Sequence, residues 1–315
     1  MGSIGADAQI PTIDFSAEAA SSLLSGSDSD INIRRQVRAA LEGGGIFFLR
    51  CSESSTQSLL EEMVIGMKSL FDLPEDVKRR YKSIRPYSSY KGREPIAPLH
   101  ESFAIDDAYL LESAQAFARV FWPEGNQQVS SALNNINKMM LDLIYAILKV
   151  IFESYGAENR YELFVEKTVT SFRLLKYNLP PAGEAVGLVP HTDKNLLTML
   201  CQNDVQGLEI LSKDGIWSPL VIPQGCFVVM IGDSLKAWSN GRMRAARHKV
   251  MISGDRDRYS CGLFILPKKD VIIEVPDELV DDDHPLLYKP YNYTDYINYF
   301  VGNLKDDALE TFAGV

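Results

Sequence analysis

The sequence predicts a mixed α+β fold, in which a mainly helical first half precedes an all-β core and a short helical end. Three observations support this prediction. Apolar residues recur at helical spacing up to about residue 165, short apolar runs separated by turn residues follow, and a helical pattern rich in Tyr and Phe returns near the end. We expect three regions, at 1–165, 166–270 and 271–315, which pack as one compact unit.

The first half of the chain carries three helical patterns and one short strand. The first helical pattern stops at Gly43-Gly44-Gly45 and the second stops before Pro74. The third is the longest, and its apolar face follows i, i+3 and i+4 spacing. A continuous apolar run between the first two helices predicts a buried strand. The expected helices cover 31–41, 56–71 and 129–155, and the expected strand covers 46–49.

From about Thr168 the pattern changes to strands and turns. Turn residues such as Asn203-Asp204 and Asn240-Gly241 separate the apolar runs, and no long helical pattern intervenes. Many short strands in this arrangement favour a β-sandwich, a jelly roll or a barrel. The expected strands cover 168–177, 196–201, 207–211, 226–231, 248–253 and 259–266, and residues 293–309 are expected to be helical.

Composition and charge exclude several classes of protein. The 315 residues are 46% hydrophobic and 23% charged, which is ordinary for a globular protein, and the net charge of −10 argues against binding to nucleic acid. No apolar run reaches about 18 residues, so we expect neither a membrane helix nor a signal peptide. The four cysteines are scattered singly, which favours free thiols and a cytoplasmic location. We expect a monomer.

The most informative motif is His191-Thr192-Asp193, which is followed far along the chain by His248. On an extended stretch, side chains two residues apart lie on the same side of the backbone, so His191 and Asp193 can face one metal ion together. His248 would complete one triangular face of three ligands. This arrangement leaves open coordination positions and is that of the iron oxygenases, although zinc accepts the same ligands.

A second motif, Arg258-Tyr259-Ser260, follows His248 closely. If the strands that carry His248 and Arg258 pair as a hairpin, Arg258 lies near the metal and shares a face with Ser260. A buried arginine is costly without an anionic partner. A bound carboxylate would provide that partner, and the Ser260 hydroxyl would add a hydrogen-bond donor.

In this order, the motifs resemble the plant-type family of 2-oxoglutarate- and Fe(II)-dependent dioxygenases, within the isopenicillin N synthase-like superfamily. The resemblance covers nearly the whole chain and implies a jelly-roll (double-stranded β-helix) core with a helical N-terminal region and a C-terminal helical cover. It assigns Fe(II) to His191, Asp193 and His248, and the far carboxylate of 2-oxoglutarate to Arg258 and Ser260. Further matching segments are 10–15, 71–74, 207–209 and 232–242.

The segment Trp122-Pro123-Glu124-Gly125-Asn126 is similar to one branch of this family. That branch contains the dioxygenases that form alkenyl glucosinolates and those that oxidise auxin, and the lignan ring-closing deoxypodophyllotoxin synthase is a further relative. The resemblance therefore implies a role in plant specialised metabolism.

The strand before the H-x-D motif departs from the family pattern. The family carries N-x-Y there, and its tyrosine contacts 2-oxoglutarate. Here Tyr177 keeps the tyrosine, but Leu175 replaces the asparagine on the same face, which changes the surroundings of the phenol. We expect Tyr177 to contact the co-substrate.

The resemblance implies the oxidation of a small, largely apolar plant metabolite or hormone, by hydroxylation, desaturation or ring closure. The reaction would consume O2 and 2-oxoglutarate and release succinate and CO2. Three alternatives remain: a zinc hydrolase, a non-catalytic ligand-binding jelly roll, and an oxygenase that acts on protein or nucleic acid.

Candidate substrate contacts are strand residues that flank the ligands and aromatic residues outside the core, although for each of them packing in the core or on the surface is the interpretation we favour. For the basic residues among the candidates, solvated or structurally paired side chains are the interpretation we favour over contact with a substrate carboxylate. We expect His100 and His284 to lie outside the metal site. The candidate apolar contacts are Phe172, Leu174, Leu200, Val250, Phe264, Tyr87, Tyr90, Phe121, Tyr296, Tyr299 and Phe300, and the basic ones are Lys91, Arg93 and Arg173.

Overall fold

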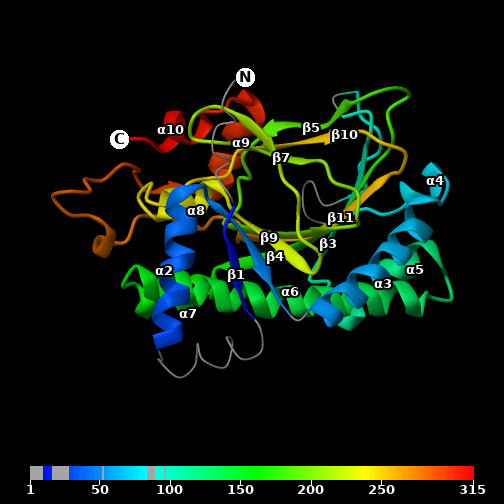
Figure 1. Ribbon diagram of the computed structural model, residues 1–315, viewed down its shortest axis with the longest axis horizontal. Helices are drawn as coiled ribbons and strands as arrows, with labels where there is room; N and C mark the ends of the chain where they lie inside the picture. Colours follow the sequence, from blue (N-terminus) through cyan, green and yellow to red (C-terminus); the bar gives the residue numbers. More distant parts are fainter. Residues whose placement is uncertain (1–9, 16–27, 52, 84–88, 96) are drawn as a thin grey trace, which may run out of the picture.

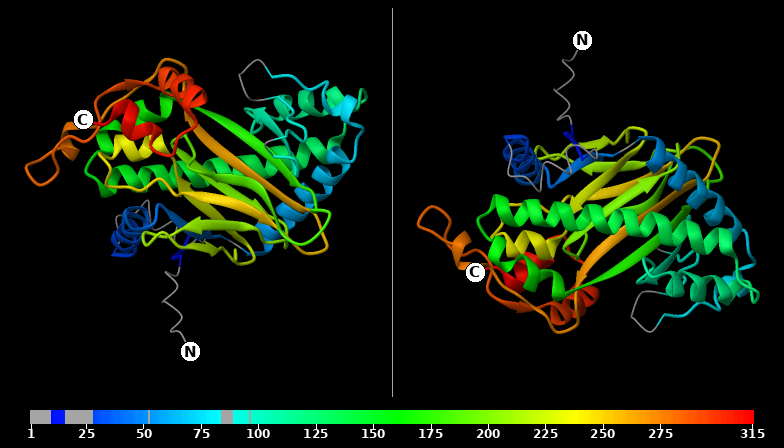
Figure 2. Two further views of the ribbon diagram at one scale, coloured as in Figure 1. Left: turned by 90° about the horizontal axis from the view of Figure 1, so that it is seen from above. Right: turned by 90° about the horizontal axis from the view of Figure 1, so that it is seen from below.

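The computed structural model describes residues 10–15, 28–51, 53–83, 89–95 and 97–315. Two β-sheets face each other, and a layer of helices covers the outer face of the larger sheet (Figure 1). Figure 2 shows the longest helix running beneath this sheet. The arrangement confirms the predicted mixed fold with a jelly-roll core.

The major sheet has seven strands in the order β1-β2-β9-β6-β11-β4-β3. All neighbours are antiparallel except β1 and β2. Strands from the first half of the chain thus extend the sheet that the second half builds. The bounds are β1 Thr12–Asp14, β2 Ile46–Arg50, β3 His100–Asp106, β4 Thr168–Tyr177, β6 Leu197–Gln202, β9 Cys226–Ile231 and β11 Arg258–Pro267.

The minor sheet has four antiparallel strands in the order β5-β10-β7-β8. A separate pair, β12 and β13, precedes the C-terminal helices. The bounds are β5 Ala185–His191, β7 Leu208–Leu211, β8 Trp217–Pro219, β10 His248–Ile252, β12 Ile272–Ile273 and β13 Tyr291–Asn292.

The helical layer is organised around α6, which spans Gln127–Ser154. Its first turn is capped by Asn126, whose side-chain oxygen accepts a hydrogen bond from the Val129 amide at 3.1 Å. Helices α2, α3 and α5 all pack against α6. The remaining helices are α2 Asp28–Gly43, α3 Glu53–Phe71, α4 Glu75–Lys78, α5 Leu111–Phe121, α7 Tyr161–Glu166, α8 Asp233–Trp238, α9 Tyr293–Asn303 and α10 Ala308–Ala313, with 3-10 turns at Glu158–Arg160 and Asp277–Leu279.

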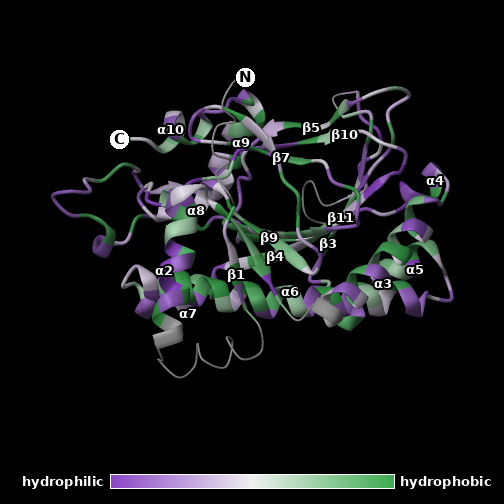
Figure 3. Cartoon of the chain, in the orientation of Figure 1, coloured by the Kyte–Doolittle hydropathy of each residue, from purple (hydrophilic) through white to green (hydrophobic). Residues whose placement is uncertain are grey.

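The hydrophobic residues form two clusters on opposite faces of the major sheet. Along β4, Phe172 and Leu174 are fully buried against the helical layer, whereas Tyr177 belongs to the cluster between the sheets. Alternation then directs Arg173 and Leu175 toward the space between the sheets as well. Figure 3 shows the apolar residues that line the central strands and the helices beneath them.

The predicted helices and the predicted strands of the second half are confirmed to within a few residues. Among the elements that the sequence patterns did not predict are β3 and α5 in the first half and β5 and β8 in the second. Strand β3 was missed because it carries Glu101 and Ser102 in buried positions, where a sequence pattern would place apolar residues. The expected C-terminal helix is divided into α9 and α10 by Leu304, which has a left-handed backbone.

The turn between α2 and β2 depends on Gly45. Its φ is +71°, and a Cβ atom built at this position would overlap the carbonyl oxygen of Arg244. Its own carbonyl accepts a hydrogen bond from the Ile231 amide at 2.9 Å, which aligns β2 with β9. Gly45 therefore joins the helical layer to the major sheet.

We predict that Gly45→Ala lowers the free energy of unfolding by about 2 kcal/mol, because alanine is strained at this φ and its methyl group overlaps Arg244. Gly43→Ala is the matched control. Gly43 lies in α2 with open space around its Cα, so alanine should leave stability unchanged or raise it by up to about 1 kcal/mol. Urea denaturation measures both, and equal effects of the two substitutions would contradict the prediction.

Candidate metal centre and co-substrate site

Two histidine rings lie side by side at the end of the minor sheet. His191 ends β5, His248 begins β10, and the two residues are paired directly in the sheet with ring centroids 4.3 Å apart. Asp193 directs its carboxylate to the same place, and one ligand atom from each of the three residues lies within 4.8 Å of the others. In the described part of the chain no other group of His, Cys, Asp or Glu side chains is arranged for a metal ion in this way.

Asp193 reaches the site by a route that differs from the expected one. Strand β5 ends at His191, so Asp193 belongs to the irregular segment that follows instead of a continuous extended stretch. The Asp193 carbonyl accepts a hydrogen bond from the Asp233 amide at 2.8 Å, which fixes this segment against the first turn of α8. This hydrogen bond holds the Asp193 backbone in place where strand pairing has ended.

Backbone carbonyls fix the orientation of both imidazole rings. His191 Nδ1 lies 2.8 Å from the Val189 carbonyl, and His248 Nδ1 lies 3.0 Å from the Ala246 carbonyl. Because a carbonyl only accepts, each Nδ1 carries the proton and each Nε2 keeps its lone pair for a metal. Burial, followed by the neighbouring His248, lowers the pKa of His191 to about 4, so its ring is neutral near pH 7.

The two oxygens of the Asp193 carboxylate have different surroundings: one accepts a hydrogen bond and the other faces the metal site. Its Oδ2 accepts from Thr198 Oγ1 at 2.5 Å, while Oδ1 faces His191 Nε2 at 3.7 Å. The Thr198 hydroxyl in turn accepts from Asn195 Nδ2 at 2.8 Å, which directs its proton to Asp193. Burial alone would raise the pKa of the Asp193 carboxyl, but His248, His191 and the Thr198 hydrogen bond together lower it.

The three free ligand atoms are therefore two imidazole nitrogens and one carboxylate oxygen, all unprotonated and held by second contacts. This donor set fits Fe(II) in the facial arrangement that leaves other coordination positions open. Zinc accepts the same donors, so the ligands alone do not identify the metal.

Arg258 lies on the opposite wall, at the start of β11 in the major sheet, and is 1% exposed. Its Nε and Nη2 donate to Gln202 Oε1 at 3.0 and 2.7 Å, and its Nη1 donates to Ser260 Oγ at 3.3 Å. The guanidinium carbon lies 5.0 Å from the centre of the Tyr177 ring. Within the described ranges no carboxylate pairs with this charge, so the protein buries a cation whose contacts are all neutral.

The expected hairpin between the strands of His248 and Arg258 is wrong. Strand β10 pairs with β5 and β7 in the minor sheet, whereas β11 pairs with β4 and β6 in the major sheet. The link at 253–257 crosses from one sheet to the other. Arg258 still faces the metal ligands, because the two sheets enclose one interior.

Tyr177 and Leu175 share the inner face of β4, as the sequence predicts. Tyr177 pairs with Arg258 across the strands, and Leu175 pairs with Ser260. The Tyr177 ring also packs on Gly187 of β5, where a Cβ atom would lie 2.8 Å from its Cδ1. A glycine at this point gives the phenol its place between the sheets.

His100 lies outside the metal site, as expected, but its side chain lies beside Tyr177 and near Arg258. It is not one of the three clustered ligands. It pairs with Tyr177 in the sheet, its ring lies 5.0 Å from the tyrosine ring, and its Nε2 is buried without a hydrogen-bond partner. Burial, then the charges of Arg173, Lys91 and Arg258, lower its pKa to about 4. His284 instead contacts Asp281 on the surface, as expected.

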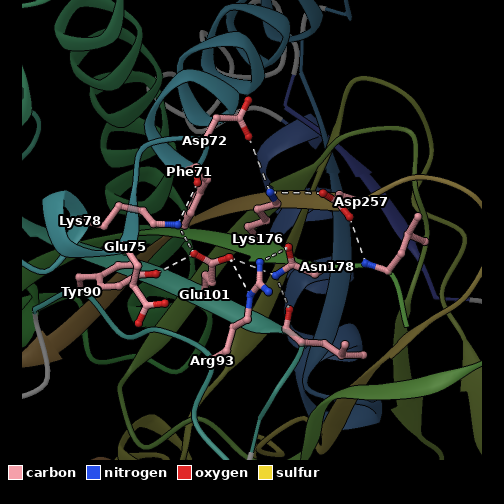
Figure 4. Close-up of polar contacts among 12 residues, drawn as sticks. Phe71, Asp72, Glu75, Lys78, Tyr90, Arg93, Glu101, Lys176, Asn178 and Asp257 are labelled. Atoms are coloured by element: carbon pink, nitrogen blue, oxygen red, sulfur yellow. Dashed lines mark hydrogen bonds and ion pairs between the residues drawn. The ribbon is translucent and has the colours of Figure 1, made fainter. Parts of the chain in front are cut away.

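A buried carboxylate, Glu101 on β3, holds the segment that precedes this strand (Figure 4). Its Oε2 accepts from Lys78 Nζ at 2.5 Å and from the Tyr90 hydroxyl at 2.7 Å, and its Oε1 accepts from Asn178 Nδ2 at 3.2 Å. Burial would raise the pKa of Glu101, but these hydrogen bonds lower it to about 2. The ionised carboxylate therefore fixes the strand that positions His100.

The other candidate contacts fall into two groups. Leu200 and Val250 lie between the sheets, and Phe264 shares the inner face of β11 with Ser260. Phe172, Leu174, Phe121 and Tyr296 belong to the core on the helical side, in line with the packing role favoured for them, and are not substrate contacts. Arg93 contacts Glu101 and Asn178, in line with a structural role, and Tyr87 lies outside the described residues.

Comparison with known proteins points to the same class. A model of the 2OG-Fe(II) oxygenase superfamily matches residues 168–267, and a model of the N-terminal region of non-haem dioxygenases in morphine synthesis matches residues 10–124. The chain is 37% identical to a probable 2-oxoglutarate-dependent dioxygenase, AOP1.2, of Arabidopsis thaliana, over 97% of this chain and 96% of that protein.

Two solved structures are similar over most of the chain. The rice dioxygenase for auxin oxidation has a TM-score of 0.81 at 30% identity, and the match covers 97% of this chain and 100% of that one. Dioxygenase for auxin oxidation 1 of Arabidopsis thaliana, in its binary complex with 2-oxoglutarate, has a TM-score of 0.77 at 28% identity, with 88% and 99% covered.

The fold and the donor set define a non-haem iron oxygenase with a jelly-roll core. The sequence identity over nearly the whole length then specifies the family: the chain belongs to the plant-type 2-oxoglutarate- and Fe(II)-dependent dioxygenases, in the branch that its motifs predicted. It is an oxidoreductase that requires Fe(II), 2-oxoglutarate and O2, and nothing supports the hydrolytic or non-catalytic alternative. No helix in the described ranges is long and apolar enough to cross a membrane.

We predict that Thr198→Val weakens Fe(II) binding by about 10- to 100-fold, because the second Asp193 oxygen loses its donor and the carboxylate loses its orientation. Thr198→Ser keeps the hydroxyl and should retain most of the affinity. Anaerobic equilibrium dialysis with Fe(II) measures the constants. Unchanged binding in folded Thr198→Val protein would show that this hydrogen bond does not position the ligand.

The lowered pKa of His100 predicts a dependence of stability on pH. The folded protein holds this ring neutral down to about pH 4, whereas the unfolded chain binds the proton near pH 6.5. Stability should therefore fall as the pH decreases from about 6.5 to about 4, by up to about 3 kcal/mol from this residue.

In His100→Gln this loss should be smaller, because glutamine does not titrate, while the contribution of His191 remains in both proteins. Urea denaturation of metal-free protein at pH 6.5 and 5 provides the comparison. If the two proteins lost the same free energy of unfolding between pH 6.5 and pH 5, the assigned environment of His100 would be contradicted.

Proposed function

We propose that this enzyme binds Fe(II) through His191 Nε2, Asp193 Oδ1 and His248 Nε2, and binds the far carboxylate of 2-oxoglutarate through Arg258 and Ser260, with Tyr177 against the co-substrate. The proposal gives a role to the three clustered ligands and to the buried guanidinium opposite them. Gln202, which the sequence analysis did not select, would hold the guanidinium in place for the incoming carboxylate.

The observation that carries this proposal is the buried charge of Arg258. A guanidinium that is 1% exposed and hydrogen-bonded only to neutral groups is costly to bury. A dicarboxylate that spans from the metal to Arg258 would neutralise the charge and form a charge-assisted pair with it. A zinc hydrolase would have no use for such a cation opposite its ligands.

The chemistry divides between the cofactor and the protein. Bound Fe(II), together with O2 and 2-oxoglutarate, supplies the oxidising power, and the co-substrate leaves as succinate and CO2. The protein orients the reactants: two backbone carbonyls hold the imidazoles, Thr198 holds the carboxylate, and Arg258 fixes the co-substrate. No side chain has to act as a general acid or base in this arrangement.

For the substrate, we propose a small and largely apolar organic molecule that is hydroxylated, desaturated or closed into a ring. Leu200, Val250 and Phe264 face the interior and favour apolar surface. The similar enzymes from rice and Arabidopsis thaliana are described as dioxygenases for auxin oxidation, which supports a small plant metabolite or hormone.

We further propose that the enzyme acts as a cytoplasmic monomer. All four cysteines are free thiols, and three of them are buried. This usage fits a reducing compartment.

The assignment is tested by adding Fe(II) and 2-oxoglutarate to metal-free protein without oxygen. We predict a weak visible charge-transfer band, because the keto acid would chelate a metal that is held by these three ligands. His191→Ala should remove both iron and band. A folded wild-type protein that gives no band would refute the proposed site.

Replacing Arg258 with Leu should weaken 2-oxoglutarate binding by about 100-fold, which corresponds to the loss of a buried charge-assisted pair. Fe(II) binding should remain, because His191 and His248 lie on the other sheet and Asp193 follows the strand that carries His191. Arg256→Leu is the matched control, since Arg256 is 60% exposed and, among the described residues, forms ion pairs with Asp204 and Asp255. Titration of the charge-transfer band gives the affinities, and an unchanged affinity in Arg258→Leu would remove Arg258 from the co-substrate site.

A further inference from the structure

A second arginine, the half-buried Arg173, lies on the inner wall of the barrel and has no role in the site described so far. It stands four residues before Tyr177 on β4, so the two side chains share the face that looks toward the minor sheet. Its partners across the strands are Gly262 and Ala104, two of the smallest residues. They leave space in which the guanidinium lies over the Phe264 ring, 5.0 Å from its centre.

The charge of Arg173 is not compensated by a protein carboxylate. Its Nε is buried without a hydrogen-bond partner, and no ion pair joins it to an acid within the described ranges. The acid whose charge acts on it is Asp193, which is already engaged by Thr198. A cation in this state lowers the stability of the free protein, which is tolerated where a ligand supplies the opposite charge.

Two basic groups near Arg173 do not cancel its charge: Lys91 adds positive charge, and the His100 ring is neutral near pH 7. Burial and then Arg173 lower the pKa of Lys91 and of His100, so both groups lie within the field of the guanidinium. Tyr293, at the start of α9, is close enough for Arg173 to affect its pKa as well. The result is an anion-attracting region bordered by aromatic rings and adjacent to Asp193.

The co-substrate does not account for this region. The far carboxylate of 2-oxoglutarate is assigned to Arg258, which pairs with Tyr177, and its keto-acid end is assigned to the metal. Arg173 lies four residues along β4 from Tyr177, or about 13 Å at the usual rise of a strand. One small dicarboxylate bound at Arg258 and at the metal has no third anionic group for Arg173.

We propose that Arg173 binds a carboxylate group of the organic substrate, so that this dioxygenase acts on a small aromatic or apolar carboxylic acid. The proposal rests on the site assignment above and adds the substrate class to it. The planar guanidinium can hold a carboxylate through two parallel hydrogen bonds while Phe264 supports its face. Arg173 would thereby fix the distance between the acid group and the carbon that is oxidised.

One arm of the test needs no substrate. Arg173→Leu removes a half-buried charge that no carboxylate pairs with in the described residues, so we expect the metal-free protein to melt about 2–4 °C higher than wild type. If Arg173 stabilised the fold through its contacts, Arg173→Leu would melt at a lower temperature than wild type. A lower melting temperature for Arg173→Leu, with Arg256→Leu unchanged, would overturn the proposal.

The second arm measures binding to the anaerobic protein loaded with Fe(II) and 2-oxoglutarate. The probes are phenylacetate, indole-3-acetate and cinnamate, each paired with its neutral amide, and calorimetry gives the affinities. We expect at least one acid to bind wild type more than tenfold more tightly than its amide. Arg173→Leu should lose this preference, and Arg173→Lys should keep part of it.

The charge-transfer band separates this proposal from the assignment of the co-substrate site. The band and the 2-oxoglutarate affinity should stay within twofold of wild type in Arg173→Leu. A large loss of 2-oxoglutarate affinity would place Arg173 in the co-substrate site and overturn the proposal. The proposal would also be overturned if none of the acids bound to wild-type protein that shows the band. The same conclusion would follow if Arg173→Leu kept the preference for acids over amides.

Discussion

The interior of this protein is organised around positive charge that the chain does not neutralise. Arg258 is held between the two sheets by Gln202, Ser260 and the Tyr177 ring, all of which are uncharged. Hydrogen bonds offset part of the desolvation cost, and a bound dicarboxylate would offset the rest. Much of the site follows from this constraint: a glycine on β5 makes room for Tyr177, and the two clustered histidines lie on the opposite sheet.

Each sheet carries a different part of the site. The minor sheet presents His191 and His248 as direct neighbours, with backbone carbonyls fixing both rings. The major sheet presents Arg258 and Ser260, and α6 and its partner helices cover its outer face. The ionised Glu101 secures the edge strand β3 through hydrogen bonds that connect distant segments.

Much of the fold could be predicted, because periodicity and turn residues are local properties of the chain. The metal ligands were selected in the same way, from residue types at a recognisable spacing. The sequence could not show that 253–257 crosses between sheets, since a crossing and a hairpin turn use the same residues. His100 and Gln202 were missed because only long-range register places them beside Tyr177 and Ser260.

The most direct test is a crystal structure of the anaerobic complex with Fe(II) and 2-oxoglutarate. The account predicts iron bound to His191 Nε2, Asp193 Oδ1 and His248 Nε2, with the keto acid on the metal and the far carboxylate on Arg258 and Ser260. Arg173 should remain without a carboxylate partner in this complex. Iron at other residues, or a co-substrate carboxylate that contacts Arg173 instead of Arg258, would contradict the account.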